Sequence, residues 1–131
     1  MRTQLKNKTQ NGSKLNKMND NTYAMRRKVM DVIYLAKRKG YDLPRIEVRI
    51  VNGGKEEVCG YAYLGKNIVH IKQEYINIHP AQFIHLVLHE IVHAVTGFGH
   101  DENCHLMNPC IPTIAEAREY KCWEAFSKYI G

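Results

Sequence analysis

The chain has 131 residues, of which 44% are hydrophobic, and a formal net charge of +6. This length allows one domain with a single core and excludes a large second lobe. The sequence contains neither an apolar run of membrane-spanning length nor the apolar stretch of about 7–15 residues that a secretory signal requires. We therefore expect a monomeric cytoplasmic protein with no membrane partner, encoded by a cell or a virus.

The positive charge is concentrated at the start of the chain. Residues 1–40 contain eleven Lys and Arg against two Asp, a net charge of +9, so residues 41–131 carry −3. Residues 1–19 lack aromatic side chains and apolar runs, which predicts a disordered basic tail ahead of a domain at residues 20–131. This tail offers a contact for nucleic acid, but a solubilising extension is favoured because no aromatic platform accompanies the charge.

A helix and then a strand are predicted at the start of the domain. Asp20 or Asn21 caps a helix that extends to about Lys39 and ends at Gly40. Residues 45–51 alternate strictly between polar and apolar side chains, which is typical of a half-buried strand. The apolar stripe of the helix consists of Met25, Val29, Val32, Ile33 and Ala36.

A β-hairpin is predicted next. Residues 58–64 and 68–72 are rich in aromatic and β-branched side chains, and they flank a Gly-Lys-Asn turn at 65–67. In the second strand, two apolar residues alternate with His70 and Lys72.

Residues 83–95 form the strongest helix prediction, because they contain no Gly or Pro and are long enough for three turns. Apolar residues cover most of this helix, so we expect it to be buried through the middle of the domain. His89, Glu90 and His93 interrupt its apolar surface. Polar groups in such a helix are costly unless something pairs with them, so they indicate a functional site.

The spacing of these polar residues is that of a catalytic zinc site. His89 and His93 lie four residues apart, so both imidazoles project from one face of the helix and reach one metal ion. Glu90 is placed to take a proton from the metal's water as general base. Gly97 ends the helix, and His100 beyond the turn supplies a third ligand, leaving one position for water. The sequence therefore predicts a hydrolase with one Zn²⁺ per chain, and a peptidase acting on peptides or proteins in particular.

A last helix is predicted from about Thr113 to Tyr129. The order of helix, strand, hairpin, buried helix and final helix makes a small α+β domain. The four cysteines lack Cys-x-x-Cys spacing, so free thiols are expected.

The stretch that begins at His89 and runs to the sequence Leu-Met-Asn-Pro resembles the metzincin clan of zinc peptidases, including its matrixin and archaemetzincin branches. In that clan a glycine turns the chain after the helix, and a methionine turn lies beneath the metal. The resemblance assigns His89, His93 and His100 as zinc ligands, Glu90 as general base and Met107 as the turn methionine. It implies a minimal metzincin-like domain with an N-terminal helix, a small mixed sheet with an edge hairpin, an active-site helix, a Met-turn and a C-terminal helix.

The resemblance also implies a substrate strand. In metzincin-like folds an edge strand over the cleft pairs with the extended substrate. By order and position, the first strand of the hairpin matches it, and the alternative is an ordinary sheet edge. The substrate-binding residues would then be Gly60, Tyr61, Ala62 and Tyr63.

One spacing departs from the clan's usual pattern. Gly97 lies four residues and His100 seven residues after His93, where three and six are usual. A Gly-x-Gly turn tolerates the extra residue, because glycine accepts positive φ at little cost. Asp101 and His105 are the local alternatives for the third ligand.

Three further classes of zinc protein remain open. Gluzincin-type peptidases use a Glu on a following helix as third ligand, and Glu116 and Glu119 lie on the final predicted helix. SprT-like zinc proteases, which associate with DNA, also have a looser spacing to their third histidine, and the basic N-terminus agrees with them. A non-catalytic zinc module would close the coordination sphere with Cys104 or Cys110.

Overall fold

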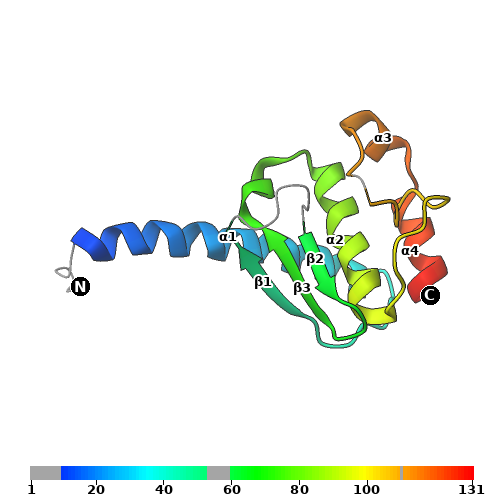
Figure 1. Ribbon diagram of the computed structural model, residues 1–131, viewed down its shortest axis with the longest axis horizontal. Coiled ribbons are helices and arrows are strands. Elements are labelled where there is room, and N and C mark those ends of the chain that lie inside the picture. Colours follow the sequence, from blue (N-terminus) through cyan, green and yellow to red (C-terminus); the bar gives the residue numbers. More distant parts are fainter. Residues whose placement is uncertain (1–9, 53–59, 110) are drawn as a thin grey trace.

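The computed structural model describes residues 10–52, 60–109 and 111–131, with the main chain alone at 10–21 and 60–63. Four α-helices, a short 3₁₀ helix and three strands make an α+β domain (Figure 1). Among the helices of these residues, none has the combination of length and apolarity that crossing a membrane requires. The elements are α1 (Gln10–Arg38), β1 (Glu47–Val51), β2 (Gly60–Tyr63), β3 (Ile68–Lys72), η1 (Gln73–Asn77), α2 (Pro80–Thr96), α3 (Ile114–Glu119) and α4 (Cys122–Ile130).

The sheet is mixed and has the strand order β1-β3-β2. β3 runs parallel to β1 and antiparallel to β2, so the predicted hairpin is confirmed. Gly65 and Asn67 both have positive φ, 70° and 61°, which the tight turn between β2 and β3 requires. His70 and Lys72, which alternate with the apolar residues of β3, are buried as well. β3 is the central strand, and both of its faces are covered.

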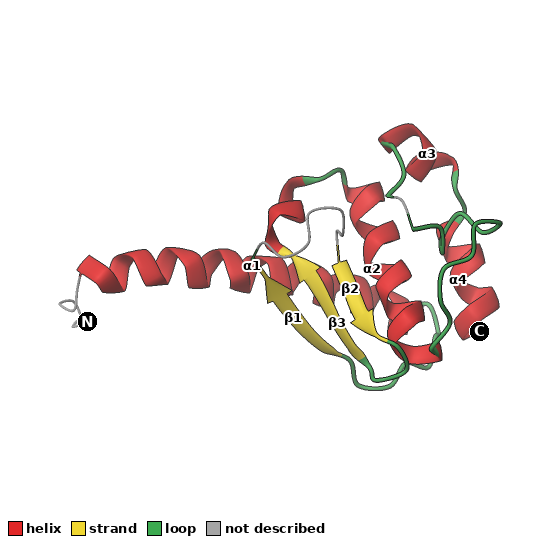
Figure 2. Cartoon of the chain, in the orientation of Figure 1, coloured by secondary structure: helices red, strands yellow, loops and turns green. Residues whose placement is uncertain are grey.

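α1 is longer than its sequence predicted. The helix begins at Gln10, so the predicted N-cap at Asp20 or Asn21 is wrong, and residues 10–19 of the predicted tail belong to the helix. Once the packed part has nucleated, each further residue adds a hydrogen bond, and this polar stretch contains no Pro to stop it. The predicted apolar stripe is confirmed, since its five residues, Met25, Val29, Val32, Ile33 and Ala36, are all buried. Figure 2 shows α1 crossing behind the strands.

α2 is the central element of the core. It begins with Pro80 at its first position, capped by the His79 side chain, and ends at Gly97, which has a φ of 80°. It contacts β2, β3, α1, α3 and α4, so nearly all of its surface is covered. The predicted helix over 83–95 is confirmed. Its buried residues include His85 and the three polar residues of the predicted site, at positions 89, 90 and 93.

The C-terminal helix is broken in two, so the single predicted helix over 113–129 is wrong. α3 ends before Tyr120, whose φ and ψ of −71° and 133° are extended rather than helical. The Tyr120 ring stacks on His105, with centroids 3.8 Å apart. α4 then packs on α2 and buries Phe126 completely.

Candidate metal centre

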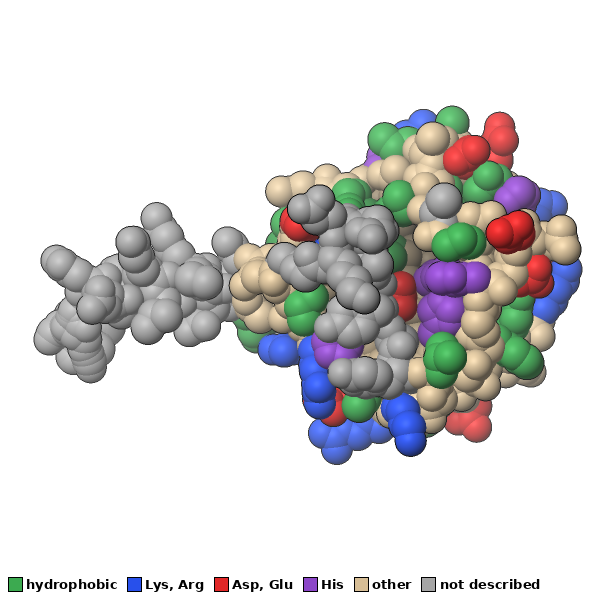
Figure 3. All heavy atoms as spheres, viewed as in Figure 1, with side chains coloured by type: hydrophobic (Ala, Val, Ile, Leu, Met, Phe, Trp, Pro, Cys, Tyr) green, Lys and Arg blue, Asp and Glu red, His purple; other side chains and the backbone are tan. Residues whose placement is uncertain are grey.

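Three histidines form a cluster at the C-terminal half of α2. One ring nitrogen from each of His89, His93 and His100 lies within 4.8 Å of the others. The ring centroids are 4.6 to 5.2 Å apart. His89 and His93 are buried, whereas His100 is exposed, and Figure 3 shows histidine side chains reaching the surface of this face. Within the described part of the chain, this is the one group of His, Cys, Asp and Glu placed to hold a metal ion.

Main-chain carbonyls fix the orientation of the two helical imidazoles. His89 Nδ1 lies 2.6 Å from the carbonyl oxygen of Leu106, and His93 Nδ1 lies 2.7 Å from that of Phe98. A carbonyl oxygen only accepts, so each Nδ1 carries the proton and donates. Each Nε2 therefore has a free lone pair and points into the cluster, which is how ordered metal-binding histidines are held.

The two Nε2 atoms lie 3.1 Å apart. Two lone pairs at that distance repel unless a cation or a proton lies between them. Burial lowers the pKa of His89 to about 4 and also lowers the pKa of His93, so a shared proton is disfavoured at neutral pH. Two nitrogens bound tetrahedrally to one zinc, each at about 2.0–2.1 Å, would lie about 3.3 Å apart. The donor set therefore fits a bound metal ion.

His100 joins this pair despite the extra residue in the preceding turn. Gly97, in the left-handed region, turns the chain out of α2, and its N–H donates to the carbonyl of His93. Beyond His100, the N–H of Asp101 donates to the carbonyl of Met107 at 2.9 Å. The loop is therefore tied at both ends, which places the His100 ring over the two helical histidines.

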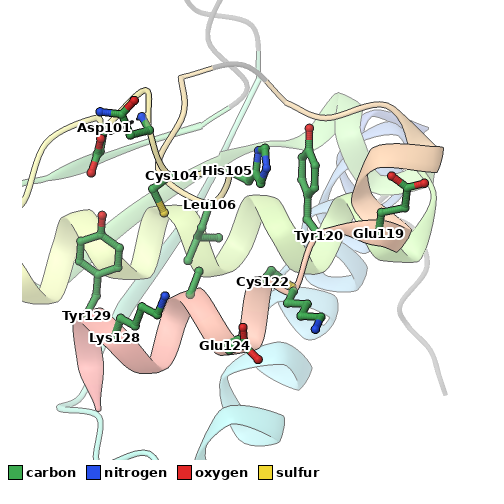
Figure 4. Close-up of a pocket in the computed structure, with 13 residues that line it drawn as sticks. Asp101, Cys104, His105, Leu106, Glu119, Tyr120, Cys122, Glu124, Lys128 and Tyr129 are labelled. Atoms are coloured by element: carbon green, nitrogen blue, oxygen red, sulfur yellow. Dashed lines mark hydrogen bonds between the residues drawn. The ribbon is translucent and has the colours of Figure 1, made fainter.

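The local alternatives for the third ligand lie elsewhere. Figure 4 shows the side chains of Asp101 and Cys104 directed toward Tyr129 of α4, and burial together with these two neighbours raises the pKa of Tyr129 to about 12. His105 stacks on Tyr120 instead (Figure 4). These residues line a separate groove of about 640 Å³ between this loop and α4. None of them belongs to the histidine cluster.

The remaining alternatives are also outside the cluster. Glu116 forms a capping box with Thr113 at the start of α3, where its carboxylate accepts from the Thr113 N–H at 2.9 Å. Glu119 is exposed on the same helix. Cys110 lies outside the described residues.

The Glu90 carboxyl group lies beside the cluster. Glu90 is 3% exposed, and its Oε2 is 4.0 Å from His89 Nε2. Its Oε1 has no hydrogen-bond partner among the residues that the structure describes. Burial raises the pKa of Glu90 to about 8, and a nearby cation would lower it again by favouring the carboxylate. This group is thus placed to exchange protons next to the site.

Met107 lies directly after the residue that orients His89. Leu106 and Met107 are both fully buried. The Leu106 carbonyl accepts from His89, and the Met107 carbonyl accepts from Asp101. The segment that carries the predicted turn methionine is therefore part of the support of the histidine cluster.

The predicted substrate strand, β2, lies at an edge of the sheet and contacts α2. The side chains of its four residues lie outside the described part of the structure. The turn after β2 is joined to the end of α2, because Gly65 N–H donates to the His93 carbonyl at 3.0 Å. Leu64 and Phe98 flank this junction, and both are more than half exposed. We call these two exposed side chains the apolar rim: main-chain hydrogen bonds of Gly65 and Phe98 join it to His93, and the Phe98 ring lies 5.6 Å from that of Tyr129. Nothing in the sequence pattern distinguished the two residues.

The other buried histidine near the cluster, His85, is not one of its members. It is 3% exposed, and burial lowers its pKa to about 4. Its ring lies 6.1 Å from Tyr120. His79 has a structural role, since its Nδ1 accepts from the Ala81 N–H and caps α2.

No protein-family model, curated protein or solved structure matches this chain.

Proposed function

We propose that the protein is a zinc-dependent endopeptidase in which His89, His93 and His100 hold one Zn²⁺ per chain. The observation that carries this proposal is the pair of Nε2 atoms 3.1 Å apart, with both Nδ1 atoms committed to main-chain carbonyls. Among the described residues, no hydrogen-bond donor is placed to pair with the two Nε2 lone pairs. They are therefore available to bind a cation.

The chemistry of the ligands favours zinc among the metals. Three imidazole nitrogens suit zinc and other late transition metals, whereas calcium and magnesium require oxygen ligands. Three protein ligands leave a coordination position for water, as in catalytic rather than structural zinc sites. The turning of Cys104 toward Tyr129 supports this over a closed structural site.

A zinc ion in such a site supplies Lewis acidity, which lowers the pKa of a water and polarises a carbonyl. Glu90 then acts as the general base. Its carboxylate accepts the proton of the attacking water and returns it to the leaving amine. The position of Oε2, 4.0 Å from His89 Nε2, supports this role.

An extended peptide is the substrate that the surroundings favour. β2 presents a strand edge beside α2, and an extended segment adds to such an edge through main-chain hydrogen bonds. The apolar rim of Leu64 and Phe98 would contact side chains next to the cleaved bond. Together with the spacing of residues 89–109, these features favour a metzincin-like peptidase.

The proposal is tested by incubating the zinc-loaded protein with an unfolded protein such as casein and counting new amino termini. We expect cleavage that a chelator abolishes and added zinc restores. His93→Ala should be inactive, whereas His105→Ala should be active, since His105 lies outside the cluster. Bound zinc with no new amino termini, across several unfolded proteins, would contradict the proposal.

A further inference from the structure

A second concave surface, separate from the histidine cluster, lies between α1 and the start of β1. This groove has a volume of about 710 Å³, and the β2–β3 turn contributes to its lining. Four cationic side chains line it: Arg26 and Lys37 from α1, Arg45 before β1 and Lys66 from the turn. All four are exposed.

The groove has a strong excess of positive charge. Among its described lining residues, Glu47 is the one carboxylate, and it is already paired with Arg49 at 2.6 Å. Within the described residues, Lys37, Arg45 and Lys66 make neither a hydrogen bond nor an ion pair. Figure 3 shows Lys and Arg side chains gathered along the edge of the molecule where β1 begins. Like charges gathered along one groove raise the local potential and attract anionic groups.

The floor of the groove is apolar. Met30 and Ile33 from α1 face Ile46 and Val48 across it, with Ile68 at the end. On α1, the groove residues 26, 30, 33 and 37 follow one stripe of the helix. Lys37 lies eleven residues after Arg26, a separation of roughly 16 Å along the helix axis, which matches about five residues of extended chain.

We propose that this groove binds an acidic segment of a partner protein, about five or six residues long, in which carboxylates alternate with apolar side chains. The apolar residues of the segment pack on the floor, and its carboxylates pair with the cationic rim. An acidic peptide fits better than single-stranded nucleic acid, because the described lining contains no aromatic side chain on which bases would stack.

The groove is also connected to the histidine cluster. Asn67, which lines it, donates from its N–H to the carbonyl of Ala94 at 3.0 Å, next to His93 on α2. Given the proposed peptidase function, on which this one step rests, a protein docked by an acidic segment would be held close to the cleavage site. The binding itself requires no catalysis.

The test is fluorescence anisotropy with a labelled six-residue peptide of alternating glutamate and leucine. All proteins carry Glu90→Gln so that the probe stays intact whether or not the protein is a peptidase. We expect saturable binding at low salt that weakens steeply as salt is added. The double variant Lys37→Glu, Lys66→Glu should bind about tenfold more weakly or worse.

Arg38→Glu is the control for the single variant Lys37→Glu, because Arg38 is exposed on α1 next to Lys37 but does not line the groove. At about 0.15 M salt, where exposed charges are screened beyond about 8 Å, it should change the affinity less than about twofold and less than Lys37→Glu does. Peptides with glutamine for glutamate, or serine for leucine, should each lose most of the affinity. An equal loss in Arg38→Glu, full binding of the serine peptide, or tighter binding of an oligothymidine would each overturn the proposal. Circular dichroism of every variant verifies that it is folded.

Discussion

His89 and His93 are oriented by two carbonyl groups from outside α2, so that their Nε2 atoms lie 3.1 Å apart. The helix alone brings the two rings to one face. The carbonyls of Leu106 and Phe98 then select the tautomer that directs both lone pairs to one point. The three histidines of the cluster are therefore placed so that they could hold a metal ion.

Metal binding should stabilise the fold. A ligand that binds only the native state at about 1,000 times its dissociation constant adds about 4 kcal/mol to the free energy of unfolding. We expect zinc to raise the midpoint of thermal unfolding and a chelator to lower it, measured by calorimetry. His93→Ala should show no zinc-dependent rise, whereas His105→Ala should show the full one. An identical rise in His93→Ala would place the zinc elsewhere.

Glu90→Gln should separate metal binding from catalysis. The amide has nearly the shape of the carboxyl group but cannot accept a proton from water. We expect bound zinc at the wild-type level and a kcat reduced about 10²–10⁴-fold, the typical contribution of a general base. The measurement is zinc content together with the rate of peptide cleavage. A variant with full zinc and the wild-type rate would exclude Glu90 as the base.

Phe98→Ser should change specificity without removing the metal. The interaction with His93 uses the Phe98 carbonyl, which the substitution retains, while the exposed ring is lost. Cleavage next to apolar substrate residues should fall about tenfold in kcat/KM, consistent with losing one hydrophobic contact. Tyr34→Ser is the control, since Tyr34 is equally exposed but lies on α1. If kcat/KM is the same in the two variants, the apolar rim does not contact the substrate.

Stability of the metal-free protein should fall in mild acid. Burial lowers the pKa of His85 from 6.5 to about 4, so between these values the unfolded chain binds a proton that the folded chain does not. The stabilisation is complete above pH 6.5 and is lost as the pH falls toward 4. A shift of this size corresponds to at most about 3 kcal/mol.

The contribution of His85 can be isolated by substitution. Burial also lowers the pKa values of His89 and His93, so these residues contribute to the same loss of stability in acid. The metal-free wild type is therefore compared with His85→Leu by urea unfolding at pH 7 and pH 5. The variant should lose less stability between the two pH values than the wild type. Equal losses would mean that His85 is not the buried titrating group.

The sequence was sufficient to predict elements whose signals are local. The helix over 83–95 and the hairpin around the Gly-Lys-Asn turn both follow from periodicity and from residues that stop or turn the chain. The i, i+4 spacing of His89 and His93 likewise places them on one face of a helix. No tertiary contact is needed for these predictions.

The wrong predictions concern helices whose ends depend on tertiary contacts or on the cooperativity of helix formation. Nothing in residues 113–129 marks the break at Tyr120, whose ring stacks on His105, fifteen positions earlier in the chain. The start of α1 at Gln10 depends on propagation from a packed segment. The carbonyls of Leu106 and Phe98 were not predicted as supports, since every residue has a carbonyl and only the fold aims it.

The most direct test of the metal site is zinc content by elemental analysis, on the wild type and on three single variants. His100→Ala removes the third histidine of the cluster, whereas Asp101→Ala and Cys104→Ala remove neighbouring groups that face Tyr129. The site as described predicts one zinc per chain in the wild type and in the last two variants, with loss in His100→Ala alone. Full zinc in His100→Ala, or none in the wild type, would contradict it.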